Sequence, residues 1–271
     1  MPRISIGDAE LYYEDTGQGE PLLLVPGLSG RGSFWVNQVA EFSRDFRVVV
    51  HDHRGTARST HSRIRYSVEQ MADDVLRLMD ALGIEAAHLV GHSTGGAIGQ
   101  VIALEHPRRL RSLVLSATWA GPDPYFLRLF ESRKGVLLSQ GVDAYLRASA
   151  LFMSPPAWIS AHDALLTEQH TAALAEAAPV EVTASRIDAI MRHDRRARLG
   201  EIRVPTLVIV ARDDMITPRL YSDELARGVP DARLVVLDTG GHGAPGVCAP
   251  DYNAAVGGFL RAQRGRPPVR V

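Results

Sequence analysis

Short, continuous runs of apolar residues recur along the chain and predict buried β-strands. Such runs are typical of strands that are covered on both faces, as in a parallel sheet. Two further apolar segments within residues 4–14 flank a Gly-Asp turn and predict a β-hairpin. The continuous runs comprise residues 21–25, 47–50, 86–90, 113–116, 206–211 and 232–237.

Between the runs, apolar residues recur at helical spacing. Ser67 has the position of an N-cap, Gln70 follows three residues later, and Gly83 ends the predicted helix. Strands that alternate with helices form a mostly parallel sheet. We therefore predict an α/β fold, with a mostly parallel eight-stranded sheet and helices on both faces. The predicted helices comprise residues 34–46, 67–82, 96–106 and 250–264.

Residues 122–198 interrupt this alternation, because they show helical periodicity and no convincing strand. Pro155, Pro156 and Pro179 divide the segment. An insertion at the carboxyl end of a parallel sheet lies over the place where such sheets bind ligands. We therefore predict a helical cap at 122–198, inserted between two strands of a core. The predicted core comprises residues 1–121 and 199–265, and residues 266–271 are predicted to be a loose tail.

Composition and charge exclude several classes of protein. The 271 residues carry a net charge of −1, which gives no indication of binding to nucleic acid or to an anionic membrane. Cys248 is the single cysteine, so no intrachain disulfide forms, and no Cys/His spacing for zinc is present. We find no signal peptide and no apolar stretch long enough to cross a bilayer, so the simplest location is the cytoplasm. We predict no metal and no cofactor, and the oligomeric state stays open, with a homodimer as one alternative.

The most informative motif is Gly91-His92-Ser93-Thr94-Gly95, at a predicted junction of strand and helix. A G-x-S-x-G in this position resembles the nucleophile elbow of α/β-hydrolases. The turn is so tight that the serine takes a strained conformation, and Gly91 and Gly95 lack the Cβ atoms that would collide with neighbouring backbone. The alternative is a glycine-rich helix start that packs closely on a strand. We predict that Ser93 is a nucleophile.

A serine hydroxyl needs a base, and the base needs a carboxylate that orients it. In this fold class the acid and then the histidine follow the serine along the chain. Asp213 and Asp214 both follow the strand predicted at 206–211, and the Asp-x-x-x-Pro spacing to Pro218 that is usual in these hydrolases favours Asp214. Asp213 would then be solvated or would stabilise the loop.

His242 lies between two glycines after the last predicted strand, and we predict that it is the base. The alternative is a loop histidine whose hydrogen bonds are satisfied and which has no part in catalysis. His51 and His53 could line the site, but they precede the serine. His92 lies inside the elbow, and we expect it to point away from the partner of the nucleophile.

The glycine-rich loop after residue 25 is expected to complete an oxyanion hole. We predict that the backbone N–H groups of Leu28 and Thr94 stabilise the negative charge that develops on the substrate. A glycine-rich loop could also bind phosphate, but this one lacks both G-x-G-x-x-G and G-x-x-x-x-G-K-[ST].

Taken together, these segments resemble the α/β-hydrolase superfamily across nearly the whole chain. The matching segments are PGLSGRGSFW at 26–35, HDHRGTARS at 51–59, VGHSTGGAIG at 90–99, ARDDMITP at 211–218 and GGHGAP at 240–245. The segment LFMSPPAWI at 151–159 is similar to the cap of the RutD group, which hydrolyses aminoacrylate or carbamate. Enol-lactonases and small carboxylesterases are related in pattern. Two positions depart from the pattern of these hydrolases. Pro26 stands where a histidine often precedes the oxyanion glycine, and Ala57 stands where many have a glycine in the Arg-Gly-x-Gly turn.

The resemblance implies a cofactor-free serine hydrolase that acts on a small carboxyl derivative. An enamine, carbamate or amide of pyrimidine catabolism would be the substrate of a RutD-like enzyme, and an ester or enol-lactone is the alternative. A ligand sensor with a hydrolase fold and a perhydrolase on the same triad are further hypotheses. Five aromatic or sulfur-containing side chains are candidates to line the pocket, although packing of the cap on the core would also explain them. They are Trp119, Phe130, Phe152, Met153 and Trp158.

Overall fold

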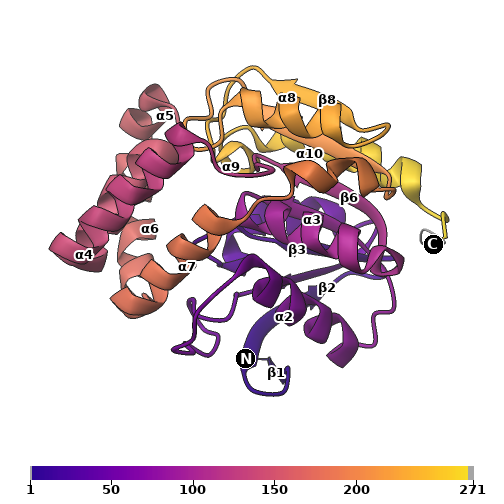
Figure 1. Ribbon diagram of the computed structural model, residues 1–271, viewed down its shortest axis with the longest axis horizontal. Helices are drawn as coiled ribbons and strands as arrows, with labels where there is room; N and C mark the ends of the chain where they lie inside the picture. Colours follow the sequence, from indigo (N-terminus) through magenta and orange to yellow (C-terminus); the bar gives the residue numbers. More distant parts are fainter. Residues whose placement is uncertain (1, 268–271) are drawn as a thin grey trace.

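The computed structural model describes residues 2–267 and has one eight-stranded sheet at its centre, as predicted (Figure 1). The strand order is β1-β2-β4-β3-β5-β6-β7-β8. β2 pairs antiparallel with β1 and with β4, and all remaining pairs are parallel. The strands are β1 (Arg3–Ser5), β2 (Glu10–Thr16), β3 (Pro21–Val25), β4 (Arg47–His51), β5 (Ala87–His92), β6 (Leu110–Ser116), β7 (Thr206–Ala211) and β8 (Arg233–Leu237).

Helices cover both faces of the sheet. The apolar side chains of β5 explain this arrangement, because Leu89 packs in the core on one face and Val90 in the core on the other. On the face of Leu89 lie α2 (Val68–Ala81), α3 (Thr94–Glu105) and α8 (Arg219–Gly228). On the face of Val90 lie α1 (Val36–Phe42) and α10 (Ala249–Gln263), with η1 (Gly32–Trp35) and α9 (Ala244–Val247) nearby.

Between β6 and β7 the chain forms four α-helices, which we call the inserted helices; Figure 1 shows them grouped at one side of the sheet. Gly141, with φ 82° and ψ −175°, divides the first of them by a kink. The short helices η2 (Pro107–Arg109) and η3 (Arg196–Glu201) lie outside this group. The inserted helices are α4 (Pro124–Met153), α5 (Pro156–Ala161), α6 (Asp163–Ala175) and α7 (Val180–Arg192).

The predicted elements differ from the observed ones mainly at their ends. The helix predicted at 34–46 is divided into η1 and α1 and ends at Phe42, because the following turn leads directly into β4. The cap of α2 is as predicted: the Ser67 hydroxyl accepts a hydrogen bond from the Gln70 N–H at 3.1 Å, and Gly83 has φ 66° just after the helix. Of the predicted loose tail, residues 268–271 lie outside the described part of the chain.

Ala57 has φ 44°, in the left-handed region that favours glycine. A glycine would adopt this conformation without the strain that a Cβ atom causes. Replacing Ala57 with glycine is expected to raise the free energy of unfolding by roughly 0.5–1 kcal/mol, as measured by urea denaturation. The control is Ala172→Gly at an exposed position of α6, which is expected to lower it by a similar amount. Equal effects of the two changes would contradict the argument.

Candidate active site

Ser93 occupies the sharp turn between β5 and α3. Its φ of 54° and ψ of −117° are strained values for a residue with a side chain. The surrounding hydrogen bonds hold this conformation: the Ser93 N–H donates to the Ser116 carbonyl at 2.8 Å, and the Thr118 hydroxyl donates to the Ser93 carbonyl at 2.7 Å. Because Ser93 directly precedes α3, its side chain lies at the positive end of that helix dipole.

Two glycines of the motif permit close backbone packing around this serine. A Cβ atom on Gly91 would lie 2.2 Å from the Gly95 carbonyl oxygen, and one on Gly95 would lie 2.1 Å from the Val25 carbonyl oxygen. The second contact brings the loop after β3 against the turn. In that loop, a Cβ on Gly27 would lie 3.6 Å from the Ser93 hydroxyl oxygen. The loop that we predict to supply an oxyanion donor is therefore adjacent to Ser93.

His242 and Asp214 are brought together by the loops after β8 and β7. The His242 Nδ1 lies 2.9 Å from Asp214 Oδ2 and 3.1 Å from Oδ1, and both side chains are buried. The backbone N–H groups of Ile216 and Thr217 donate to Asp214 Oδ1 at 2.8 and 2.9 Å. These donors fix the carboxylate, which in turn fixes the orientation of the imidazole ring. Asp214, rather than Asp213, is thus the acid beside the histidine.

Ser93 and His242 lie at the same edge of the sheet, since β5 and β8 are both parallel members of it. The hydrogen bonds among residues 2–267 do not include one between their side chains. The residue before Ser93, His92, has its ring 4.7 Å from that of His242 between centroids, so the turn of Ser93 and the loop of His242 are neighbours. Catalytic hydrogen bonds are often long in a protein without substrate and shorten in the complex.

The expectation that His92 points away from the partner of the nucleophile is wrong. Its ring packs on His242 and on Phe34, and its Nδ1 lies 3.1 Å from the Ser116 hydroxyl. Side chains alternate between the two faces of a strand, so His92, as the last residue of β5, reaches the side of the sheet on which His242 lies. Burial lowers its pKa well below the usual value, and the nearby His242 contributes in the same direction. His92 is therefore neutral at neutral pH.

The two predicted oxyanion donors are the N–H groups of Leu28 and Thr94. Thr94 is the first residue of α3, where N–H groups have no partner within the helix. The Gly27 carbonyl accepts a hydrogen bond from the Gly30 N–H at 2.9 Å. In a trans peptide the carbonyl and the next N–H point in opposite directions, so the Leu28 N–H points away from this turn. Among the described residues it has no hydrogen-bond acceptor.

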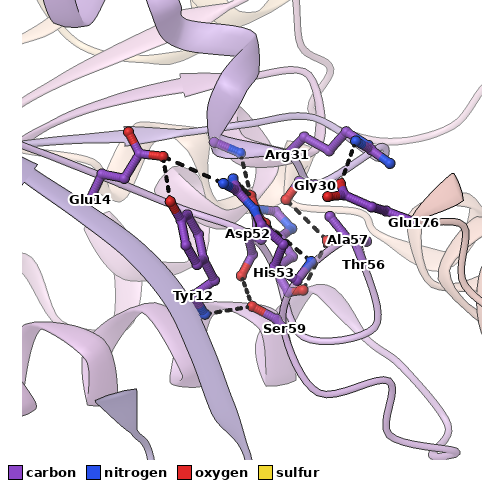
Figure 2. A network of polar contacts seen from close by, with 12 residues as sticks. Tyr12, Glu14, Gly30, Arg31, Asp52, His53, Thr56, Ala57, Ser59 and Glu176 are labelled. Atoms are coloured by element: carbon purple, nitrogen blue, oxygen red, sulfur yellow. Dashed lines mark hydrogen bonds and ion pairs between the residues drawn. The ribbon is translucent and has the colours of Figure 1, made fainter. Parts of the chain in front are cut away.

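The loop at 51–59 holds the loop at 26–32 in place (Figure 2). The His53 N–H donates to the Gly30 carbonyl at 2.8 Å. The fully buried Asp52 carboxylate accepts the Gly32 N–H at 2.8 Å and is neutralised by Arg58, at 2.7 Å. His51 and His53, which we considered as residues that line the site, are both buried, with their rings stacked 5.0 Å apart.

Asp213 stabilises the turn that precedes His242, a role that the sequence left open. Its carboxylate accepts the Thr239 hydroxyl at 2.7 Å and the Gly241 N–H at 2.9 Å. Burial acts to raise the pKa of Asp213, but these hydrogen bonds outweigh it and lower the pKa below its ordinary value. The carboxylate is therefore ionised at neutral pH and anchors the turn.

Replacing Asp213 with asparagine is expected to lower kcat by roughly threefold to tenfold, since an amide accepts only one of the two hydrogen bonds and His242 becomes less well positioned. The expected effect is far smaller than that of Asp214→Asn, which removes the group that orients the imidazole. Steady-state kinetics with an activated ester measure both variants. A loss in Asp213→Asn as large as that in Asp214→Asn would contradict the assignment of the two roles.

The five predicted pocket residues make packing contacts. Met153 ends α4, and its carbonyl accepts the Gly243 N–H at 2.5 Å, which joins the inserted helices to the turn of His242. Trp119 is fully buried and packs 4.7 Å from Phe126, which also contacts Phe130. Trp158 stacks on the His162 ring at 4.2 Å, and Phe152 is half-buried. A pocket role for these side chains stays a prediction.

Within residues 2–267 there is no cluster of three or more histidine, cysteine, aspartate and glutamate side chains suited to a metal ion. In the same part of the chain, none of the helices is long and apolar enough to span a membrane.

Comparisons with known proteins agree with this fold. The family model described as the alpha/beta hydrolase fold matches residues 20–245. The RutD protein of Azorhizobium caulinodans, which is named for a carbamate hydrolase activity, is 41% identical over 259 residues, covering 96% of this chain and 98% of that protein. A RutD protein of Pseudomonas savastanoi is 41% identical over 243 residues, covering 89% and 94%.

Among solved structures, the enol-lactonase of Burkholderia xenovorans has a TM-score of 0.89 at 29% identity and covers 96% of this chain and 100% of its own. A thermophilic esterase of Thermogutta terrifontis has a TM-score of 0.86 at 28% identity, covering 97% and 98%.

Proposed function

Because the chain belongs to the α/β-hydrolase family, and its relatives are hydrolases, we propose that it is a serine hydrolase in which Ser93, His242 and Asp214 form the catalytic triad. The observation that supports this most directly is the pair of contacts from His242 Nδ1 to Asp214, at the same edge of the sheet as the strained Ser93. We propose that the inserted helices form a cap over this edge.

In the proposed mechanism, His242 accepts the proton of Ser93 while the serine oxygen attacks the carbonyl carbon of the substrate. Asp214 holds the tautomer of His242 and stabilises the imidazolium that forms. The oxyanion accepts hydrogen bonds from the N–H groups of Leu28 and Thr94. His242 then donates its proton to the leaving group. His242 next deprotonates a water molecule, which attacks the acyl carbon; the bond from that carbon to the Ser93 oxygen breaks, and His242 returns the proton to this oxygen as the acid leaves. The chain's own residues supply every group that these steps require.

For the substrate, we propose a small carboxyl derivative of the RutD type, namely a carbamate, enamine or amide of pyrimidine catabolism. Two RutD proteins at 41% identity support this choice. An ester or enol-lactone is the second candidate, since an enol-lactonase and an esterase are close in structure. The two candidates share the acyl-enzyme chemistry at Ser93 and differ in the leaving group.

The test uses the purified protein with a panel that contains a carbamate, a simple amide, an enol-lactone and p-nitrophenyl acetate. The expected result is many turnovers per protein molecule on at least one compound, and modification of Ser93 by a fluorophosphonate, located by peptide mass spectrometry. The ratio of kcat/KM values for the carbamate and the esters decides between the two substrate classes. A single turnover with a shift in melting temperature would indicate a ligand sensor, and a fluorophosphonate on a residue other than Ser93 would contradict the triad.

A further inference from the structure

Arg186 is a buried arginine in the middle of α7, one of the inserted helices. Only 1% of the residue is exposed. Its guanidinium donates to the Arg54 carbonyl at 2.8 Å and to the Leu28 carbonyl at 3.2 Å, and lies 3.1 Å from His53 Nδ1. The Leu28 contact lies in the loop that we predict to supply an oxyanion donor, and the His53 contact lies in the loop that holds it in place. Arg186 therefore joins the inserted helices directly to these two loops.

All three polar partners of Arg186 are uncharged. The carbonyls of Leu28 and Arg54 are neutral, and burial with the nearby arginine lowers the pKa of His53 well below its ordinary value. No carboxylate forms an ion pair with Arg186 in the described part of the chain. Asp74, a carboxylate that influences it, is already paired with Arg54 at 2.7 Å. Burial lowers the pKa of Arg186 to about 10, so the group is still a cation at neutral pH.

Burying a charge without a counter-ion is costly. Hydrogen bonds to carbonyls, together with the Tyr66 ring at 5.5 Å, offset part of this cost. The Arg186 Nε remains without a partner. A group that only filled space between α7 and the loops would be less costly as an apolar side chain, so the position of the charge needs another explanation.

The contact with Leu28 supplies that explanation. The Gly27 carbonyl is held by the Gly30 N–H, and the Leu28 carbonyl is held by Arg186. The peptide groups before and after Leu28 are thus both held through their carbonyls, which leaves the Leu28 N–H in one orientation. The same contact places a positive charge, with which no carboxylate among the described residues is paired, 3.2 Å from the carbonyl oxygen of Leu28, the residue whose N–H is the predicted oxyanion donor.

We propose that Arg186 is a positioning residue, which fixes the Leu28 peptide from the inserted helices and places a positive charge beside the oxyanion. This inference rests on the proposed function, because it requires Leu28 to act as an oxyanion donor. It assigns to the inserted helices a part in transition-state stabilisation, in addition to covering the site. The developing negative charge is the counter-ion that the resting protein does not provide for Arg186.

The test compares Arg186→Met and Arg186→Lys with the control Asp188→Asn. Asp188 also lies on α7, where it pairs with Lys134 on α4 at 2.6 Å, so its loss disturbs the packing of the inserted helices without changing a contact of Leu28. Each variant is measured for kcat and KM on p-nitrophenyl acetate, for the affinity of a phenylboronic acid and of the product acetate, and for melting temperature. The boronic acid forms a bond from Ser93 oxygen to boron, and the serine proton passes to His242. Its anionic tetrahedral adduct therefore measures the oxyanion site, whereas acetate measures ground-state binding.

In Arg186→Met, kcat is expected to fall by roughly 10- to 100-fold with KM changed by less than about threefold, and boronic acid affinity to fall with kcat while acetate affinity is kept. Arg186→Lys retains the charge but not the fork of donors, so its kcat and its boronic acid affinity are expected to lie between those of the parent and those of Arg186→Met. It provides the test if the methionine variant does not fold. Losses no greater than those in Asp188→Asn, or a parallel fall of boronic acid and acetate affinity, would overturn the proposal. If only this inference is wrong, the parent protein is still active and its Ser93 is still modified by the fluorophosphonate. If the proposed function is wrong, Ser93→Ala retains full activity.

Discussion

Replacing Ser93 with alanine is expected to lower kcat/KM for p-nitrophenyl acetate by about 10⁴-fold or more. The change removes the oxygen that would form the acyl-enzyme, and the remaining groups can only assist a direct attack by water. The fold should be retained, because alanine has the same Cβ and the hydrogen bonds that hold the turn are made by the Ser93 backbone. Steady-state kinetics and a melting curve measure the two effects separately.

The matched control for this prediction is Ser222→Ala. Ser222 is also a buried serine, it lies on α8, and its hydroxyl has no partner among the described residues. Its loss is expected to leave kcat/KM within about twofold of the parent value. An activity of Ser93→Ala within tenfold of the parent, with an unchanged melting temperature, would show that Ser93 is not the nucleophile. The mechanism proposed above would then have to be abandoned.

The fold, and the candidate residues Ser93, Asp214 and His242 at one edge of its sheet, could be predicted because their signals are local. The glycines around Ser93 are required because a Cβ atom on Gly91 or Gly95 would lie only 2.2 or 2.1 Å from a backbone carbonyl oxygen. The continuous apolar runs correspond to strands because both faces of the sheet are covered. Ser93, Asp214 and His242 each follow a predicted strand. Because these strands are parallel, the loops that follow them meet at one edge of the sheet.

The parts that could not be predicted depend on contacts between residues distant in sequence. The direction of His92 depends on the packing of Phe34 and His242 against it; Phe34 lies in η1 and His242 in the loop after β8. The role of Asp213 depends on the path of the chain at 239–241, after the next strand. Arg186 has no motif around it, and its meaning appears only when α7 lies against Leu28. A buried arginine and an exposed one look alike in a helical sequence.

The second large effect that we expect is a loss of stability in mild acid, caused by five buried histidines. Burial is the first cause of a lowered pKa in each of them, and for His51 and His193 the pKa falls to about 4. In the unfolded chain a histidine titrates near 6.5. Between these values the unfolded state binds more protons than the folded state, so the free energy of unfolding falls as the pH falls. The five are His51, His53, His88, His92 and His193.

Each such histidine contributes at most about 1.4 kcal/mol per pH unit to this decline, so the total between pH 6.5 and pH 5 is expected to be several kcal/mol. A typical domain has only about 5–15 kcal/mol of stability, and the protein should therefore begin to unfold in this range. Carboxylates with a lowered pKa, such as Glu20 and Asp213, contribute in the same direction but only below about pH 4.5. Between pH 6.5 and pH 5 the decline is therefore due mainly to the histidines.

Urea denaturation at pH 7.5, 6.5, 5.5 and 5.0 measures this dependence, and His193→Phe tests its origin. Both ring nitrogens of His193 are buried without a partner, and the ring packs on the edge of Trp119, so phenylalanine fits the site and costs no hydrogen bond. The variant is expected to show a decline that is shallower by up to about 1.4 kcal/mol per pH unit, and to be more stable than the parent at pH 5. The exposed His106, replaced with glutamine, controls for the loss of a histidine as such. A free energy of unfolding that stays constant from pH 7.5 to 5.0 would mean that these histidines accept protons in the folded protein, and that their surroundings are more polar than the packing around His193 implies.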